Sequence, residues 1–182
     1  MTRSSQATEL LTFRDEPRAS DAAAVRDIVA STGFFHDFEI DVAVELVEER
    51  LARGLASEYY FTCADDAAGR LVGYACFGPI ACTVGSFDLY WIAVHNDRRG
   101  RGLGLELMRR AEQAMSTALP GPSGKPLSRG RRVYVETSSQ PKYEPTRTFY
   151  LKCGYSEEAR FRDFYADGDD KVVYSKTLPT GP

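Results

Sequence analysis

The feature that most constrains the fold is an apolar segment that leads through a glycine-rich, basic turn directly into an amphipathic helix. Residues 89–94, LYWIAV, have the apolar and β-branched composition of a buried strand. Next comes the turn HNDRRGRGLG, and residues 103–119 then place Leu103, Leu107 and Ala111 on one helical face. The sequence therefore predicts a strand–turn–helix unit in which glycines leave the start of the helix uncovered.

This turn has the composition of an anion-binding site. Gly100, Gly102 and Gly104 let the backbone approach an anion closely, and a helix start supplies unpaired N–H groups with partial positive charge. Full positive charge comes from Arg98, Arg99 and Arg101. A bound pyrophosphate and a tight turn with solvated arginines both fit this spacing. The chain has neither the GK[ST] of a P-loop nor the GxGxxG pattern of a dinucleotide-binding fold.

The other segments predict an α+β domain built around one sheet. Helices are expected at residues 21–31 and 41–54, with Ser20 and Asp41 as their N-terminal caps. The remaining elements are a helix at residues 145–154 and strands at residues 9–14, 59–63, 71–80, 86–95, 131–137, 158–165 and 171–177. The 182 residues therefore predict a single domain with a mixed, mostly antiparallel central sheet of about six or seven strands flanked by four helices.

The composition argues against several classes of function. A formal net charge of −3 disfavours a general nucleic-acid-binding protein, and no apolar run is long enough for a signal peptide or a membrane span, so we expect a cytoplasmic protein. The two histidines, His36 and His95, are not accompanied by the GxSxG motif of a Ser-His-Asp hydrolase. The cysteines are scattered, without CxxC or metal-ligand spacing, so we expect buried, reduced thiols and no metal site. They are Cys63, Cys76, Cys82 and Cys153.

Two motifs resemble those of the GNAT N-acetyltransferase superfamily. Residues 99–104, RGRGLG, match its [Q/R]-x-x-G-x-[G/A] signature and follow an apolar strand, as the signature does. Residues 149–155, FYLKCGY, resemble its FYxKxGF segment at the end of the last helix. The expected order of elements is also similar, so the resemblance covers about residues 8–178 of the single domain 1–182. It implies the GNAT acyl-CoA N-acyltransferase fold and an enzyme that moves an acetyl group from acetyl-CoA to a primary amine by direct attack in a ternary complex.

The resemblance also implies how the cosubstrate acetyl-CoA is held. In this family the strand before the signature diverges from its neighbour, and its free backbone groups pair with the pantetheine arm. A backbone N–H near Ala93 or Val94 would hold the thioester oxygen as an oxyanion site. No metal is implied. The implied cofactor-binding residues are Ile92, Ala93, Val94, Arg99, Gly100, Arg101, Gly102, Leu103 and Gly104.

Two carboxylates are candidates for the catalytic base. An alkyl ammonium with a pKa of about 10 must lose a proton before its nitrogen can attack. Asp88 falls where histone acetyltransferases carry a catalytic glutamate; it is shorter and would act through a water, and its apolar strand predicts a raised pKa. Glu136, at the end of the strand RRVYVET, is the rival. For either residue the alternative is a strand-end carboxylate satisfied by a neighbouring arginine or backbone N–H.

Tyr150, the tyrosine of the FYxKxGF segment, is implied as the proton donor to the leaving CoA thiolate. The alternative is a tyrosine that packs in the core beside Phe149. One position departs from the family pattern, because relatives commonly have a cofactor-binding Asn seven residues before this tyrosine and this chain has Tyr143. In this chain Ser138, Ser139 or Arg147 could bind the cofactor in place of that Asn.

The amine acceptor is expected at two loops that mix aromatic and acidic residues, TGFFHDFEID and RFRDFYADGDDK. Such a lining suits a cationic amine on a small molecule or a peptide. The alternative is that the aromatic residues anchor the loops and the acids solvate a turn. The candidate substrate residues are Phe34, Phe35, Asp163 and Tyr165, with Asp37, Phe164 and Asp167 as further candidates.

Two non-enzymatic functions remain open at this point. The chain could be an acetyl-CoA sensor that binds without catalysis, or a protein-interaction module that keeps only the fold. Retention of Tyr150 argues against both. Neither a nucleic acid nor a membrane is expected as a partner, and the sequence leaves a homodimer open.

Overall fold

The structure of this chain is a computed structural model that describes residues 10–179. Its helices are α1 (Asp21–Ser31), α2 (Asp37–Arg53), α3 (Leu103–Met115) and α4 (Glu144–Lys152), with short 3-10 helices η1 (Gly54–Ser57), η2 (Asn96–Arg98) and η3 (Pro141–Tyr143). Its strands are β1 (Thr12–Arg14), β2 (Tyr60–Asp65), β3 (Leu71–Pro79), β4 (Ser86–Val94), β5 (Arg132–Ser138), β6 (Ser156–Ala166) and β7 (Asp169–Thr177). The predicted order of strands and helices is confirmed.

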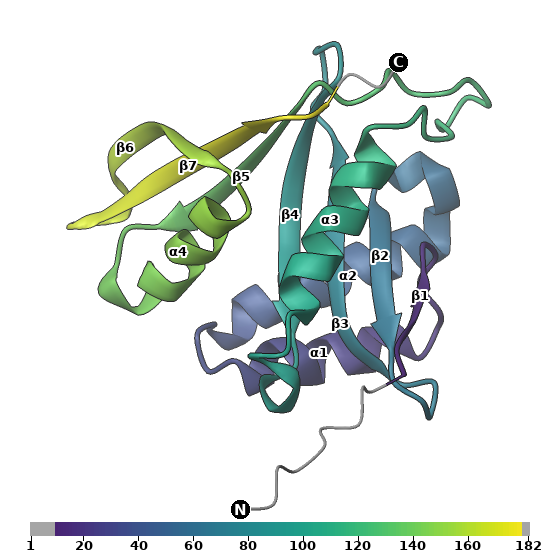
Figure 1. Ribbon diagram of the computed structural model, residues 1–182, viewed down its shortest axis with the longest axis horizontal. Helices are drawn as coiled ribbons and strands as arrows, with labels where there is room; N and C mark the ends of the chain where they lie inside the picture. The colour runs from purple at the N-terminus through teal and green to yellow at the C-terminus, as the bar shows by residue number, and fades with distance from the viewer. Residues whose placement is uncertain (1–9, 180–182) are drawn as a thin grey trace, which may run out of the picture.

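All seven strands form one sheet in the order β1-β2-β3-β4-β5-β7-β6. Every neighbouring pair is antiparallel except β4 and β5, which are parallel and are connected through α3. Parallel neighbours need a crossover, so α3 has to return along the sheet between them. The mixed, mostly antiparallel sheet with four helices agrees with the prediction (Figure 1).

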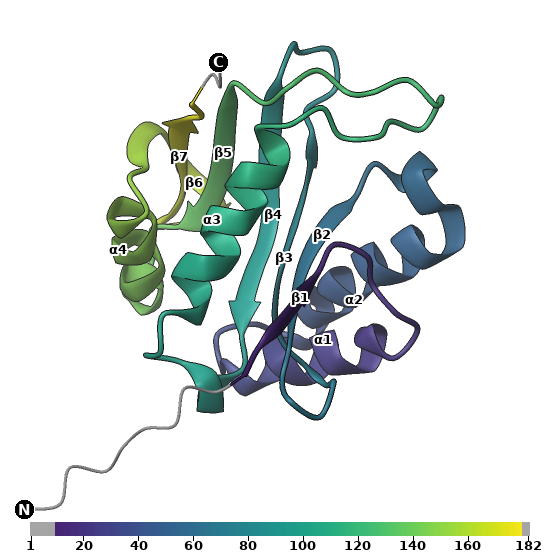
Figure 2. The same ribbon diagram turned by 45° about the vertical axis from the view of Figure 1, so that its right-hand side comes forward.

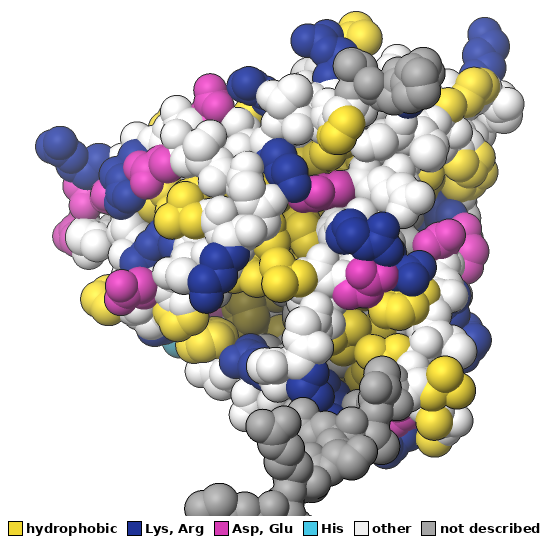
Figure 3. All heavy atoms as spheres, viewed as in Figure 1, with side chains coloured by type: hydrophobic (Ala, Val, Ile, Leu, Met, Phe, Trp, Pro, Cys, Tyr) yellow, Lys and Arg dark blue, Asp and Glu magenta, His cyan; other side chains and the backbone are white. Residues whose placement is uncertain are grey.

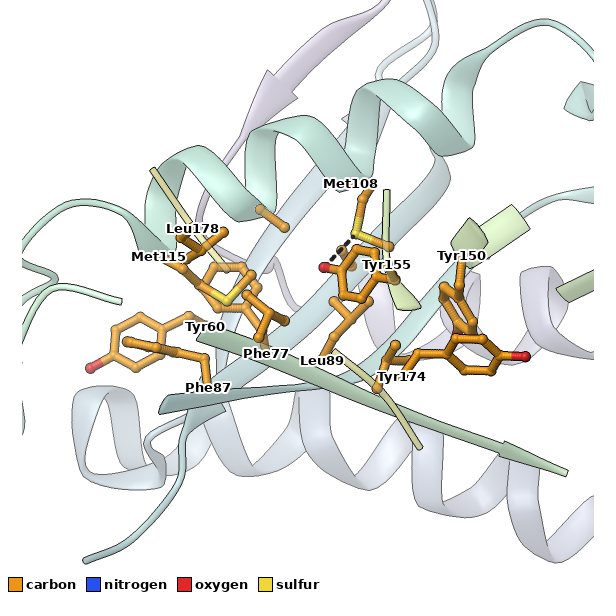
Figure 4. Packing of buried hydrophobic residues seen from close by; sticks show 14 of the residues in the cluster. Tyr60, Phe77, Phe87, Leu89, Met108, Met115, Tyr150, Tyr155, Tyr174 and Leu178 are labelled. Carbon is orange, nitrogen blue, oxygen red and sulfur yellow. Dashed lines mark hydrogen bonds between the residues drawn. The ribbon is translucent and has the colours of Figure 1, made fainter. Parts of the chain in front are cut away.

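The helices cover the two faces of the sheet as pairs (Figure 2). Buried residues of α1 and α2, such as Ile28 and Val47, pack with β2 and β3 in one core. Residues of α3 and α4 pack on the opposite face in a second core, where Met108 of α3 lies against Tyr155 and where Tyr150 and Tyr174 also lie (Figure 4). Each helix presents its apolar stripe to the sheet, so the sheet is buried from both sides.

The two predicted helix caps have different outcomes. Ser20 is the N-cap residue of α1, as predicted, although its side chain makes no hydrogen bond to the first turn. The prediction of Asp41 as the second cap is wrong. Helix α2 starts at Asp37, ahead of the predicted residue 41, because His36 and Glu39 form a capping box in which the His36 N–H donates to the Glu39 carboxylate at 2.8 Å. Asp41 therefore lies inside the helix, where it pairs with Arg26 at 2.7 Å.

Other sequence expectations need smaller corrections. Helix α3 ends at Met115 and not at residue 119, and residue 9 of the first predicted strand lies outside the described residues. Cys63 and Cys76 are buried free thiols as expected, but Cys82 is exposed. Across residues 10–179 no group of three or more His, Cys, Asp or Glu side chains is placed to hold a metal ion. No helix in this range is both long and apolar enough to cross a membrane.

Candidate functional site

The central feature of the site is that β4 and β5 begin as neighbours and then separate. Their register contains three pairs and ends where Asp88 pairs with Tyr134. Beyond that point β4 continues against β3, up to Val94, while β5 continues against β7. Figure 1 shows the two strands diverging. Within the described chain, the edge of β4 that faces β5 therefore has no strand partner over its last residues, which include Ile92 and Ala93.

A β-bulge at Tyr90 sets which side chains face each core. The register with β3 pairs Leu89 with Phe77 and Trp91 with Cys76, so Tyr90 is the extra residue. Leu89 lies in the core under α3, and Trp91 packs against the core under α1 and α2. Because of the bulge, Leu89 and Trp91 contribute to opposite cores, just beyond the point where β4 separates from β5.

The glycine turn between β4 and α3 adopts a backbone that other residues rarely adopt. Gly100 has φ +75° and Gly102 has φ +82°, and a Cβ on either residue would meet no atom within 4 Å. These glycines are needed for their backbone conformation, and both face open space. The first helical hydrogen bond runs from the Glu106 N–H to the Gly102 oxygen at 3.1 Å, so the N–H groups just before Glu106 are free of helical partners. The turn therefore has the open helix start on which the prediction of an anion-binding site depends.

Gly104 has a different role from the other two glycines. A Cβ at this position would lie 3.3 Å from Cε2 of Phe149 on α4. Gly104 therefore lets α4 approach α3 closely, which the spacing of the motif did not indicate.

The arginines of the turn have different partners. Arg98 lies 3.5 Å from the Asp66 carboxylate, and its side chain is 24% exposed. The guanidinium of Arg99 lies 5.4 Å from the ring centroid of Phe34, in the loop between α1 and α2. Arg101 is exposed beside the start of α3. The sequence treated the three as equivalent, but Arg99 links the turn to the predicted acceptor loop and Arg98 is held by β2–β3.

The space-filling view shows a hollow where β4 and β5 separate. It lies between α4 and the N-terminal end of α3, hydrophobic side chains line it, and Lys and Arg side chains lie on its rim (Figure 3). An apolar groove with a basic rim suits a ligand that has an apolar arm and an anionic end.

Asp88 and Glu136 lie on the same face of the sheet, opposite to α3 and α4. Each stands between residues that face the α3–α4 core, and Asp88 pairs with Tyr134, two residues before Glu136. Burial, and then the charge of Glu136, raise the pKa of Asp88 to about 6, so the predicted raised pKa is confirmed. Glu136 is half-exposed and pairs with Lys171 at 3.1 Å. The structure brings both candidate bases to the separation of β4 and β5.

Tyr150 lies on α4 and is 6% exposed, with its ring 5.9 Å from Tyr174 and 6.1 Å from Tyr155 (Figure 4). Its hydroxyl has no hydrogen-bond partner among the described residues, but it is not one of the fully buried unpartnered oxygens, such as that of Tyr74. Burial raises the pKa of Tyr150 well above its usual value, so the hydroxyl stays protonated at neutral pH.

The loop between α1 and α2 contacts η3, which follows β5. The ring of Phe35 lies 4.9 Å from Trp91 and 6.4 Å from Tyr143, and Phe34 lies 6.1 Å from Tyr143. The Lys142 ammonium donates to the Phe34 oxygen at 3.1 Å. Phe34 and Phe35 thus anchor the loop, as the alternative interpretation expected. Tyr143, which departs from the family pattern, contacts both rings.

The two other candidate substrate residues, Asp163 and Tyr165, lie in the final hairpin and have different environments. Asp163 has φ +51°, and its carboxylate accepts a hydrogen bond from the Gly168 N–H at 2.8 Å, so it holds the turn. Tyr165 is 48% exposed, and burial together with Glu136 and Asp169 raises its pKa to about 12. Tyr165 is therefore within reach of the charge of Glu136, whereas Asp163 is engaged within its own turn.

The residues considered as substitutes for the family's Asn hold the link between β5 and α4. Ser138 donates to Asp169 at 2.5 Å, Ser139 accepts from the Asp170 N–H at 2.8 Å, and Arg147 donates to the Ser138 oxygen at 2.7 Å. These contacts fix the position of α4 and hence of Tyr150.

Sequence reasoning missed two residues of the site. The ring of Trp91 packs against Phe35, a candidate substrate residue, and Lys171 pairs with Glu136. Trp91 could have been found, because it lies in the strand already assigned to the site. Lys171 could not, because its place beside Glu136 depends on the pairing of β5 with β7.

Comparisons with known proteins identify the family. A family model described as an acetyltransferase (GNAT) domain matches residues 56–157, more than half of the chain. A protein from Desulfovibrio desulfuricans, whose solved structure is assigned to the GNAT acetyltransferases, is 41% identical with a TM-score of 0.84, over 93% of this chain and 100% of that one. No match was found among curated proteins.

More distant solved structures share the fold. An aminoglycoside 6'-N-acetyltransferase complexed with coenzyme A is 18% identical with a TM-score of 0.68, over 95% of this chain and 99% of that one. The ribosomal-protein-S18-alanine N-acetyltransferase of Escherichia coli is 15% identical with a TM-score of 0.66, over 95% and 97%. From the family model and the 41% identical relative, this chain belongs to the GNAT acetyltransferase family.

Proposed function

We propose that this chain transfers an acetyl group from acetyl-CoA to a primary amine while both substrates are bound. The observation that carries the proposal is the separation of β4 from β5, which leaves an extended backbone edge that ends at the glycine turn. Membership of the family supports acetyl transfer, and the aminoglycoside 6'-N-acetyltransferase of the same fold was solved with coenzyme A.

In this proposal the backbone near Ile92 and Val94 pairs with the pantetheine arm, and the turn from Arg99 to Gly104 holds the pyrophosphate. The free N–H groups at the start of α3 and the positive φ of Gly102 support the second part. A backbone N–H near Ala93 would stabilise the negative charge that develops on the thioester oxygen.

The chemical step forms a bond between the amine nitrogen and the thioester carbon and breaks the carbon–sulfur bond. We assign Asp88 as the base that takes the amine proton through a water, because its pKa of about 6 leaves it ionised yet basic at neutral pH. Tyr150 would give its proton to the CoA sulfur. Burial raises the pKa of Tyr150, so its hydroxyl carries the proton that a donor must give.

The acceptor would enter from the side walled by Phe35, Trp91, Tyr143 and Tyr165. Aromatic faces with Asp88 and Glu136 between them suit an ammonium group, so we propose a cationic amine on a small molecule or a peptide. Neither nucleic acid nor membrane takes part in this proposal, and it places the enzyme in the cytoplasm.

The direct test is the release of free CoA when the protein, acetyl-CoA and a panel of amines are mixed. We expect release to depend on the amine and the acetylated amine to appear in equal amount. The same protein with Asp88→Asn serves as the matched control for chemical acetylation. No release with any amine, despite saturating acetyl-CoA, would refute the enzymatic function.

One observation favours the acetyl-CoA sensor as the second candidate: Tyr150 is almost fully packed among aromatic side chains. Thermal stability separates the alternatives, since a ligand well above its Kd must stabilise the folded state. Stabilisation by acetyl-CoA without turnover would support the sensor. The absence of any stabilisation would leave only a protein-interaction module.

A further inference from the structure

We infer that Lys171 is a positioning residue for proton removal: it pairs with Glu136, and this leaves Asp88 as the unpaired carboxylate that accepts the proton of the amine. The inference rests on the proposed function. It assigns different roles to the two carboxylates, which the sequence left as equal candidates, and it gives a role to a residue that no sequence motif indicated.

Lys171 lies on the same face of the sheet as the two carboxylates. On β7 it pairs with Ser138 of β5 on one side and with Phe161 of β6 on the other. Its ammonium lies 3.1 and 3.2 Å from the two carboxylate oxygens of Glu136. Asp88, Glu136 and Lys171 therefore stand on the neighbouring strands β4, β5 and β7, with the positive charge at one end of the row.

The hairpin fixes Lys171 in this position. Strand β6 departs from its register between Phe161 and Ala166, and the ammonium of Lys171 lies 4.0 Å from the ring centroid of Phe164 and 5.4 Å from that of Phe161. The Lys171 side chain is 15% exposed, although both rings are about half-exposed. A partly desolvated ammonium held by a carboxylate and an aromatic face is a stable fixed charge.

The two carboxylates have unequal environments. Glu136 has an ion pair and is half-exposed. Asp88 makes no hydrogen bond or ion pair with another described side chain, and burial and Glu136 raise its pKa while Lys171 lowers it. When neighbouring groups titrate together, the unpaired and more buried one takes up the proton first.

The groups that face Asp88 come from several elements. Glu136 and Lys171 act on its charge directly, and Asp88 in turn acts on Tyr90 of the same strand. Farther along the same face of the sheet, Arg132 and Glu158 pair with each other at 3.4 Å. Further titratable neighbours are Tyr134, paired with Asp88 on β5, and three groups that act on Tyr90, namely Cys76, Tyr59 and Glu58.

The inference predicts shifts of opposite sign for the two partners. Lys171→Met removes a positive charge and is expected to move the acidic limb of the kcat/KM profile up by about one pH unit. Glu136→Gln removes a negative charge and is expected to move it down by a similar amount. In the double variant the acidic limb should lie close to its wild-type pH. Lys171→Arg keeps the positive charge, so the acidic limb of this variant should not move. One acceptor is used throughout, so its own titration is common to all profiles.

A second readout does not require turnover. The carboxyl carbon of Asp88 is labelled with 13C, assigned by comparison with Asp88→Asn, and titrated by NMR in the unliganded protein. We expect the titration midpoint of Asp88 to rise in Lys171→Met and to fall in Glu136→Gln. A half-exposed Glu136 makes Glu136→Gln the safer variant if Lys171→Met does not fold. An Asp88 titration that stays at its wild-type midpoint in the charge variants would overturn the inference while acetylation persists. A wild-type protein that acetylates no amine would instead overturn the proposed function, and the positioning role with it.

Discussion

Replacing Tyr150 by Phe separates the two possible roles of this residue, proton donor and core residue. The ring of Tyr150 is buried among Tyr155, Tyr174 and Phe149, and Phe keeps all of those contacts. The hydroxyl that is removed has no partner among the described residues. Loss of an unpaired hydroxyl changes the free energy of unfolding by less than about 1 kcal/mol.

Catalysis should respond far more strongly. A positioned general acid contributes about 10²- to 10⁴-fold, equivalent to about 2.7–5.5 kcal/mol of transition-state stabilisation. We therefore expect kcat of Tyr150→Phe to fall by about 10²-fold or more, with little change in acetyl-CoA affinity. The assay measures CoA release at saturating substrates, with urea unfolding and acetyl-CoA titration on the same samples.

Tyr174→Phe is the matched control, since Tyr174 belongs to the same aromatic cluster and is also buried. It loses the same atom, and its kcat should stay within about twofold of wild type, in the range of changes away from the chemistry. The donor role is refuted if Tyr150→Phe retains turnover within about threefold of the control. A fall in kcat that parallels a loss of stability would equally assign Tyr150 to packing alone.

Three further predictions follow from single positions. Gly102→Ala places a Cβ on a residue with φ +82°, which costs about 1–2 kcal/mol and should weaken acetyl-CoA binding about tenfold, as measured by calorimetry. Gly69→Ala, at φ +76° in the β2–β3 turn, is the control and should leave acetyl-CoA binding unchanged. In urea unfolding, Asp88→Asn should be more stable than wild type above pH 6 and equally stable below about pH 4. The reason is that a carboxyl group with its pKa raised to about 6 makes the wild-type protein less stable as the pH rises from about 4 to above 6. Equal stabilities at pH 8 would contradict the burial of its charge. Tyr74→Phe removes a buried hydroxyl without a partner and should raise the free energy of unfolding by about 1 kcal/mol, and a clear loss of stability would show that the hydroxyl is bonded.

The predictable parts of the fold were those that depend on neighbours in the chain. Periodicity located the seven strands and four helices, and turn residues located most of their ends. The errors arose where a cap was chosen by residue type. His36 begins α2 because Glu39 can reach back to its N–H, and this arrangement outcompeted the capping residue Asp41.

The site residues also divide into those that depend on neighbours in the chain and those that depend on distant residues. The glycine turn could be predicted in detail because positive φ and an open helix start are properties of a short segment. Even there, the role of Gly104 was missed, because it depends on Phe149, a residue far along the chain.

The sequence by itself determined that this chain has a strand, a glycine turn and a helix with an open start, since all three are contiguous and their propensities are local. Only the tertiary structure decided how the carboxylates differ. Asp88, Glu136 and Lys171 come from three strands that are adjacent in the sheet but distant in the chain. A carboxylate's charge is governed by burial and by the charges close to it in space, and folding alone brings these together.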